Sequence, residues 1–313
     1  MKWEKKDLIT IEELSKGEIN LILETAEPFK EILRRNIKKV PPLRGRTVLN
    51  LFYEPSTRTA TSFSIAAKRL SAEIMSISTS TSSVQKGETL LDTARNLEAM
   101  KVDMVVMRHL CEGAPKFLAE RINASVINAG DGNHEHPTQC LLDLSTLKEN
   151  VKTFNGLKVL IVGDIRHSRV ARSNIWGLTK LGAKVSVCAP PTLIPQNIDV
   201  LPVDVYYHFD EAIKDKDVIY LLRIQRERMK KGLFPSTREY MNLFSMDRSR
   251  LKEAKKDIII MHPGPINRGV ELDGDVADSK NSVILNQVTN GVAVRMAVLY
   301  LLNGGNKNEK IID

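Results

Sequence analysis

Four consecutive residues, Ser56, Thr57, Arg58 and Thr59, combine three hydroxyl groups with one guanidinium group. They stand between an apolar run of strand length, residues 48–52, and a segment, residues 63–70, whose apolar side chains recur at helical spacing. A helix that begins there offers unpaired backbone N–H groups and the positive end of its dipole. Together these donors would suit an oxyanion such as phosphate, without a metal or a glycine-rich loop.

The same four residues would also suit an ordinary helix start. Ser56 or Thr57 would then cap the helix and Arg58 would be solvated. Caps of this kind are common and most of them bind nothing. Several donors of different kinds within four residues favour the anion site, but the rest of the chain has to decide between the two interpretations.

Candidate residues follow several other apolar runs of strand length. Those that come just after a predicted strand are Thr57, Lys86, Arg108 and His136. Short connections join strands to helices throughout this part of the chain, which is typical of a parallel sheet covered on both faces. Ligands of such sheets bind beyond the carboxyl ends of the strands. We therefore expect these four side chains to converge on one rim of a sheet.

The alternation of strands and helices continues to the end of the chain and predicts an α/β fold with two doubly wound parallel-sheet domains. The expected strands are residues 48–52, 74–78, 104–107, 125–128, 158–162, 184–188, 218–222 and 258–261. The polar stretch 149–155 marks the boundary, so the expected domains are residues 1–150 and 151–282.

Helices at both ends of the chain are expected to pack on the first domain. A capping-box pattern from Thr10 to Glu13 predicts where the first helix begins. The last helix, at about residues 283–303, is expected to pack back on the first domain with one apolar face. That face would carry Val288, Val292, Met296 and Leu299.

The length of 313 residues suits two domains, and 42% hydrophobic with 27% charged residues is typical of a globular protein. A formal charge of +8 favours anionic ligands in general. The basic residues are nevertheless spread along the chain, and aromatic residues make up only 5%. Nucleic-acid binding is therefore not expected.

Three cysteines, Cys111, Cys140 and Cys188, are odd in number and widely spaced. They predict a reducing compartment and no zinc site. The sequence lacks the pattern of a signal peptide or a membrane span, so we expect a cytoplasmic protein. The turn at residues 163–169 reads GDIRHSR where a dinucleotide site would have GxGxxG, so neither NAD, FAD nor any other cofactor is expected.

Six short motifs occur in a characteristic order. They are PSTRT at 55–59, KGET at 86–89, HPTQ at 136–139, GDIRHSR at 163–169, LLRIQRER at 221–228 and HPGP at 262–265. In this order and over nearly the whole chain, they resemble the catalytic chains of the aspartate carbamoyltransferase family. The resemblance implies transfer of a carbamoyl group from carbamoyl phosphate to L-aspartate in pyrimidine biosynthesis.

The resemblance also assigns roles to residues of the first domain, which holds carbamoyl phosphate in that family. The implied contacts are Ser56, Thr57, Arg58, Thr59, Ser82, Arg108, His136 and Gln139. Arg58, Thr59 and His136 would donate to the carbonyl oxygen, and Gln139 would hold the carbamoyl nitrogen. Ser82 and Lys86 would lie on a loop that reaches the neighbouring active site of a homotrimer.

The second domain would bind aspartate. The implied contacts are Lys86, Arg169, Arg223, Gln225, Gly264 and Pro265. A substrate with two carboxylates calls for more than one guanidinium, because an unpaired carboxylate is costly in a closed site. Without the motif, Arg223 would be interpreted as a strand-end arginine that pairs with a nearby acid such as Glu227.

The expected mechanism is attack of the uncharged amine on the carbonyl carbon, with Arg58, Thr59 and His136 as an oxyanion hole. The departing phosphate, neutralised by Arg58, Arg108 and Lys86, would take the amine proton. His136 would then donate a hydrogen bond rather than act as a general base. The other histidines, His109, His134, His167 and His262, are interpreted as structural or have no assigned role.

Two rival functions remain. Ornithine carbamoyltransferases share the STRT site, but they typically carry a cysteine in the loop that reads HPGP here and a Ser-Met-Gly run, and this chain has neither. An anion- or nucleic-acid-binding module would leave the arginines of the second domain unexplained. Gly264 departs from the leucine of the best-studied bacterial members. Regulatory chains or dihydroorotase are possible further partners.

Overall fold

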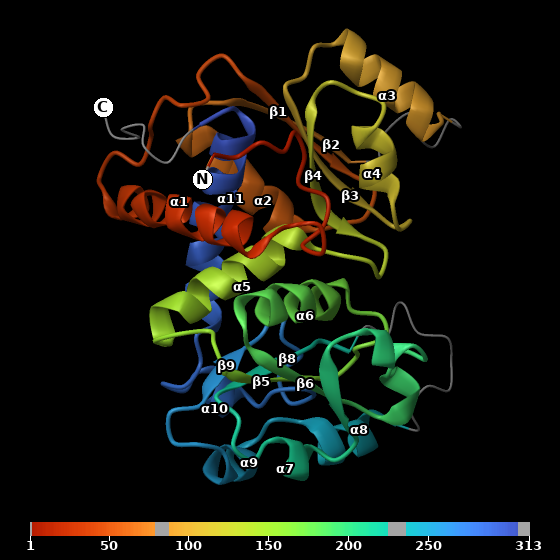
Figure 1. The fold of residues 1–313 in the computed structure, drawn as a ribbon, viewed down its shortest axis with the longest axis vertical. Coiled ribbons are helices and arrows are strands. Elements are labelled where there is room, and N and C mark those ends of the chain that lie inside the picture. Colours follow the sequence, from red (N-terminus) through yellow and green to blue (C-terminus); the bar gives the residue numbers. More distant parts are fainter. Residues whose placement is uncertain (1, 79–87, 225–235, 306–313) are drawn as a thin grey trace. The chain divides into compact units, whose positions relative to one another are not determined.

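The computed structural model describes residues 2–78, 88–224 and 236–305. Three of the predicted site residues, Ser82, Lys86 and Gln225, lie outside these ranges. The chain divides into two compact units, one formed by Met1–Ser145 with Thr289–Asp313 and the other by Thr146–Val288. Each is an α/β unit built on a parallel sheet (Figure 1).

The first unit contains a sheet of four parallel strands. They are β1 (Thr47–Phe52), β2 (Glu73–Ser78), β3 (Met104–His109) and β4 (Ser125–Asp131). Their order across the sheet is β2-β1-β3-β4. Nearly every residue of β1 and all of β4 are buried, as expected for strands that helices cover on both faces.

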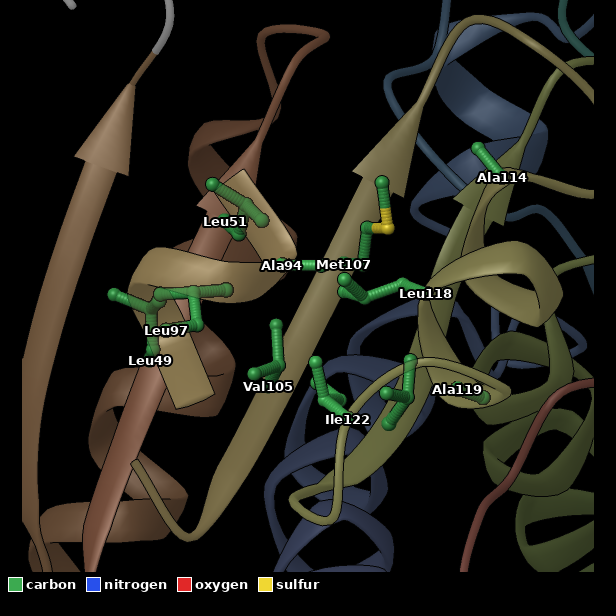
Figure 2. Packing of buried hydrophobic residues seen from close by; sticks show 11 residues of the cluster. Leu49, Leu51, Ala94, Leu97, Val105, Met107, Ala114, Leu118, Ala119 and Ile122 are labelled. Atoms are coloured by element: carbon green, nitrogen blue, oxygen red, sulfur yellow. The ribbon is translucent and has the colours of Figure 1, made fainter. Parts of the chain in front are cut away.

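Helices connect and cover these strands. They are α1 (Lys16–Arg34), α2 (Thr57–Arg69), α3 (Leu90–Ala99), α4 (Ala114–Ala119), the first part of α5 (Pro137–Asn150) and most of α11 (Ile284–Leu302). One core cluster packs side chains of β1 and β3 against α3 and α4 (Figure 2). Leu49 and Leu51 come from β1, and Val105 and Met107 from β3, two residues apart because alternate strand residues share a face.

The start of the first helix differs from the expectation. Thr10 does accept a hydrogen bond from the Glu13 backbone N–H at 3.1 Å, but the helix begins only at Lys16. Ser15 is its N-cap, and Ser15 and Glu18 form a complete capping box. Both four-residue patterns have suitable cap residues, and only the second one precedes the apolar helical repeat directly.

The last helix also differs in detail. Met296 and Leu299 are fully buried, as expected, but Val288 is 60% exposed. From Ala293 to Leu301 every residue of α11 is buried. A helix that is buried on all sides has no single apolar face, so the 3.6-residue period does not reveal its contacts.

The second unit contains five parallel strands. They are β5 (Lys158–Val162), β6 (Lys184–Cys188), β7 (Val203–Tyr206), β8 (Val218–Leu221) and β9 (Ile259–Met261), in the order β7-β6-β5-β8-β9. Sequence analysis missed β7. It is an edge strand with no fully buried residue, so it lacks the continuous apolar run by which the other strands were predicted.

The helices of the second unit are mostly short. They are α6 (Arg169–Leu181), α7 (Phe209–Ala212), α8 (Thr237–Phe244), α9 (Arg248–Glu253) and α10 (Gly274–Ala277), with 3₁₀ turns at Pro191–Leu193 and Ile198–Val200. The predicted α/β class and the two parallel sheets are confirmed.

Each sheet has one point at which the strand order reverses. In the first unit, β1 continues to β2 on one side, while β3 lies on its other side. In the second unit, β5 continues to β6, and β8 lies on the other side of β5. Such a reversal leaves a crevice beyond the carboxyl ends of the two neighbouring strands, which is where open α/β sheets bind ligands.

Candidate active site

The amino end of α2 lies just beyond β1, at the strand-order reversal of the first unit. Asn50, buried in β1, donates to the Ala60 carbonyl at 3.3 Å and to Ser64 Oγ at 3.1 Å. These bonds fix the first turns of α2 against the strand. A buried polar residue within an apolar strand is a sequence signal for such a contact, because its amide must find partners.

The predicted oxyanion residues form the first turn of this helix. Ser56 is the N-cap residue, yet its side chain makes no capping hydrogen bond. Thr57 and Arg58 are exposed and Thr59 is buried. The first turn contains no acidic residue. Since the Ser56 hydroxyl is not used to cap α2, the geometry favours the anion site over the simple cap.

Arg108 lies beside this turn, because β3 pairs with β1 in a register that places Arg108 opposite Phe52. Its guanidinium donates to Glu54 Oε1 at 3.0 Å and to the Ala129 carbonyl at 3.4 Å. Both side chains of the Arg108–Glu54 pair are mostly buried, at 13% and 16% exposure. Glu54 was not predicted as part of this site, and it holds Arg108 at the edge where an anion would bind.

His136 immediately precedes α5 and is 4% exposed. Its backbone carbonyl accepts hydrogen bonds from the N–H groups of Gln139 and Cys140 at 3.0 and 3.3 Å. The neighbouring Glu135 is fully buried, and its carboxylate accepts from the backbone N–H groups of Ile11 at 2.8 Å and Glu12 at 3.1 Å. The amino-terminal segment therefore clamps the turn that presents His136.

Asp131, at the end of β4, is the second anchor of this turn. Its buried carboxylate accepts from Asn128 Nδ2 at 2.8 Å, the Gly113 N–H at 2.8 Å and the Glu135 N–H at 3.2 Å, and it pairs with His134 Nδ1 at 3.0 Å. Burial alone would raise the pKa of Asp131, but the hydrogen bonds from His134, Asn128 and Gly113 hold it below its ordinary value. Sequence analysis assigned no role to Asp131, because a cluster of turn residues does not show which donors its carboxylate accepts from.

Gln139 lies in the first turn of α5 and is partly exposed. Its Nε2 donates to Asp143 Oδ1 at 3.0 Å, one turn further along the same helix face. In the first unit the structure thus brings Ser56–Thr59 and Arg108 to the end of the neighbouring strands β1 and β3, and His136 with Gln139 to the start of α5 after β4.

The second unit also has an arginine in the first turn of a helix at its strand-order reversal. Arg169 is the first residue of α6, is 5% exposed, and stands in a first turn without acidic residues. A buried cation at the positive end of a helix is unfavourable by itself. An anion bound there would be stabilised by both the guanidinium and the helix dipole.

The turn that leads to Arg169 is held rigidly. Buried Asp164 accepts from the His167 backbone N–H at 3.2 Å and pairs with His167 Nδ1 at 2.8 Å. Ser168 caps α6 by accepting from the Ala171 N–H at 3.1 Å. Gly163 has a φ of +122°, and a Cβ there would lie 3.0 Å from the Leu222 carbonyl oxygen, so a side chain would push β5 and β8 apart.

Arg223 follows β8, the strand next to β5. The N–H of the preceding Leu222 donates to the Val162 carbonyl at 2.8 Å, which extends the pairing beyond the strand. Arg169 and Arg223 therefore come from the carboxyl ends of adjacent strands. Gln225 cannot be placed with them because it lies outside the described residues.

The HPGP turn follows β9 and is organised by His262, which is 1% exposed. Its Nδ1 accepts the Gly264 N–H at 2.8 Å, so its Nε2 carries the proton and faces Glu271 Oε1 at 3.2 Å. Glu271 also accepts the Asn267 N–H at 2.6 Å. Gly264, at a φ of +66°, and Pro265 stand at the tip of this turn. His262 is thus a structural residue, as the sequence suggested.

Two family models match the chain. The carbamoyl-phosphate-binding domain of aspartate/ornithine carbamoyltransferases matches residues 6–149, and the Asp/Orn-binding domain matches residues 155–302. Among curated relatives, the aspartate carbamoyltransferase catalytic subunit of Moorella thermoacetica is 61% identical over 97% of this chain and 99% of its own length. That of Halothermothrix orenii is 59% identical over 99% of each chain.

Solved structures give the same result. Aspartate transcarbamoylase from Trypanosoma cruzi, in complex with carbamoyl phosphate and aspartate, has a TM-score of 0.86 at 28% identity and covers 95% of this chain and 97% of its own. Ornithine carbamoyltransferase from Pyrococcus furiosus has a TM-score of 0.87 at 32% identity, covering 98% and 99%. Sequence and fold agree, and the chain belongs to the aspartate/ornithine carbamoyltransferase family.

Proposed function

We propose that this chain is the catalytic chain of an aspartate carbamoyltransferase. It transfers the carbamoyl group of carbamoyl phosphate to L-aspartate, giving N-carbamoyl-L-aspartate and phosphate, in de novo pyrimidine biosynthesis. The observation that carries the proposal is the repeated arrangement at the two strand-order reversals. Each unit places an arginine in the first turn of a helix that has no acidic residue in that turn, Arg58 on α2 and Arg169 on α6.

This repetition fits a reaction between two anions. Phosphate would bind at the amino end of α2, and a carboxylate of aspartate at the amino end of α6. Arg223, at the end of β8, would take the second carboxylate. The curated relatives at about 60% identity that carry the name aspartate carbamoyltransferase catalytic subunit support aspartate as the acceptor. The HPGP turn, which lacks cysteine, supports it as well.

The chemistry starts with attack of the uncharged aspartate amine on the carbonyl carbon. A C–N bond forms and negative charge develops on the carbonyl oxygen, where Arg58, Thr59 and His136 donate hydrogen bonds. The C–O bond to phosphate then breaks, and the phosphate leaves with the bonding electrons and takes the amine proton. Much of the acceleration comes from holding the two substrates together.

Arg108 must contact the phosphate in addition to Glu54 for this role. In the structure its guanidinium is paired with Glu54, whereas the proposal has it supporting the phosphate. A guanidinium has five N–H donors, so Arg108 can contact both the carboxylate and an anion. Glu54 would then keep Arg108 oriented between turnovers.

The assembly is part of the proposal. Lys86 and Ser82, which lie outside the described residues, would serve the active site of a neighbouring subunit in a homotrimer. The expected location is the cytoplasm, which the three free cysteines support. Among the residues that the structure describes, no helix has both the length and the apolar character needed to cross a membrane.

Phosphate release from carbamoyl phosphate by the purified chain tests the function, with aspartate and ornithine offered side by side. We expect turnover with aspartate alone. Turnover with ornithine alone would refute the proposed roles of Arg169 and Arg223 and leave the phosphate site standing. No turnover with either amino acid would contradict the proposal as a whole.

A further inference from the structure

Two buried charged residues of the first unit lie outside the residues assigned so far. They are Asp143 on α5 and Arg295 on α11, which are 2% and 4% exposed. Arg295 Nη1 donates to Ser62 Oγ at 2.9 Å and to the Gly291 carbonyl at 3.0 Å, and the guanidinium lies 5.1 Å from the centre of the Phe63 ring. Ser62 and Phe63 belong to α2, so Arg295 is anchored to the helix that would bind phosphate.

The chain keeps space for this guanidinium. A Cβ at Gly291 would lie 2.7 Å from Arg295 Nη1 and 3.2 Å from Leu142 Cδ2. Any side chain at Gly291 would therefore displace the guanidinium or Leu142. Burying an arginine is expensive, and the matched glycine one helical turn earlier indicates that the position of its charge is specific.

Arg295 stays charged at neutral pH. Burial lowers the pKa of Arg295 to about 10, and the negative charge of Asp143 acts in the opposite direction. A Cβ at Gly291 would touch both Arg295 Nη1 and Leu142, so this cation stands close to the residue that precedes Asp143 on α5. A nearby cation favours the ionised form of the Asp143 carboxyl. An ionised carboxylate only accepts hydrogen bonds.

This charge state determines which way the Gln139 amide faces. Because Asp143 can only accept, Gln139 must present its Nε2 to Asp143 Oδ1, at 3.0 Å. Its carbonyl oxygen Oε1 is then left for a donor on the other side. The NH₂ group of a carbamoyl moiety is such a donor, whereas a methyl group in its place is not.

We propose that Asp143 and Arg295 are positioning residues that hold the Gln139 amide with its oxygen toward the substrate, so that the site selects a carbamoyl NH₂ group. The inference rests on the proposed function, since it concerns which acyl phosphate the same site accepts. It assigns a task to three side chains on α5 and α11 that the sequence did not connect.

The variant Asp143→Asn tests this inference. The oxygen of the new amide would be drawn to the Arg295 charge, and the NH₂ group of the same amide would face Gln139. The Gln139 amide must then turn so that its oxygen faces that NH₂ group, and its own NH₂ group would face the substrate. Calorimetry would measure binding of carbamoyl phosphate, acetyl phosphate and inorganic phosphate. We expect carbamoyl phosphate affinity to fall roughly tenfold, from loss of one hydrogen bond and a misplaced donor. Affinity for the two ligands without an NH₂ group should stay within about twofold.

Two further variants guard against a merely structural effect. Arg295→Met removes the charge, and Gly291→Ala displaces it while keeping it; both should reduce the preference for carbamoyl over acetyl phosphate. Asp103→Asn is the matched control, because Asp103 pairs with Arg46 at 2.7 Å at the opposite ends of the strands. It should leave the preference unchanged.

The outcomes separate clearly. Equal loss of affinity for all three ligands, or an unchanged preference in every folded variant, would overturn the inference. Thermal unfolding of each variant identifies those that fold. If the unaltered chain binds carbamoyl phosphate and turns it over with aspartate, the proposed function stands whatever the variants do. If it does neither, the proposed function fails first.

Discussion

At the scale of single residues, the proposed function depends on the arginines in the first turns of α2 and α6. Arg58 and Arg169 stand where a helix already presents positive charge. Natural helices more often have acids in that turn, because these stabilise the dipole. An arginine in place of an acid in both units is explained if each turn binds an anionic group of a substrate.

Replacement of His136 by alanine tests its role as a donor to the oxyanion. We expect kcat to fall roughly 10²- to 10³-fold, as for other oxyanion-hole donors, while inorganic phosphate binds as before. Steady-state kinetics and phosphate inhibition measure the two effects. Lost phosphate affinity with a full turnover rate would contradict the assignment.

The variant Arg169→Gln tests the carboxylate site. Loss of a charge-assisted hydrogen bond should raise the KM for aspartate roughly tenfold to a hundredfold, with carbamoyl phosphate binding unchanged. Arg172→Gln, one turn along α6, is the control and should have little effect. An unchanged KM for aspartate in Arg169→Gln would rule out a direct contact.

The three cysteines should differ in reactivity. Cys111 is exposed, whereas Cys140 and Cys188 are buried. Burial raises the pKa of the Cys188 thiol to about 12, so almost no thiolate is present at neutral pH. Titration with a thiol-reactive dye should detect one thiol in the native protein and three after unfolding. Rapid modification of three thiols in the native protein would contradict this burial.

At the scale of elements, long-range hydrogen bonds position His136. The amino-terminal segment pairs with β4, where Leu8 donates to the Val126 carbonyl at 2.9 Å and Asn128 donates to that of Leu8 at 2.9 Å. Glu135 then accepts two backbone N–H groups of the same segment. The amino-terminal segment, which is far from His136 in sequence, thus holds the turn that carries His136.

The variant Glu135→Gln tests this clamp. Because an amide has one acceptor oxygen in place of two, one buried N–H of Ile11 or Glu12 loses its partner, and stability should fall by about 1 to 3 kcal/mol. Denaturant unfolding measures the change, and kcat should fall with it as His136 loses its setting. Glu13→Gln is the control, since the Glu13 carboxylate pairs with Lys116 at 3.5 Å on the exposed surface. Unchanged stability in Glu135→Gln would show that the clamp contributes nothing.

At the scale of the whole molecule, two units of the same class place similar groups of arginines at their own strand-order reversals. In each, a helix with an arginine in its first turn follows the central strand, and a second arginine comes from the neighbouring strand: Arg108 beside β1 and Arg223 beside β5. Under the proposed function, one arrangement would serve both a phosphate and a carboxylate.

The proposed homotrimer is tested at this scale. Light scattering should give a mass about three times the 35.1 kDa of the chain. Subunits carrying Arg58→Ala, reassembled with subunits carrying Lys86→Ala, should regain activity, because some sites of a mixed trimer receive both intact residues. A monomeric mass, or a mixture that stays as inactive as its parents, would contradict shared active sites.

Much of the fold could be predicted from the sequence. Strands such as β5 are short runs of Val, Ile and Leu that contain their own signal, and their alternation with helices indicates parallel sheets. The edge strand β7 and the true start of α1 were missed or misplaced. Formation of β7 depends on its neighbours in space, and the start of α1 depends on a choice between two similar caps.

Local motifs by themselves predicted the candidate site residues, because hydroxyls and arginines at a helix start act through the local backbone. Only the tertiary structure showed that Glu54 holds Arg108, that Glu135 clamps the turn of His136, and that Arg295 lies close to Leu142, the neighbour of Asp143. These partners are separated from their targets by long stretches of chain or lie on different elements. A buried carboxylate or guanidinium reveals its role only when the fold supplies the group that neutralises it.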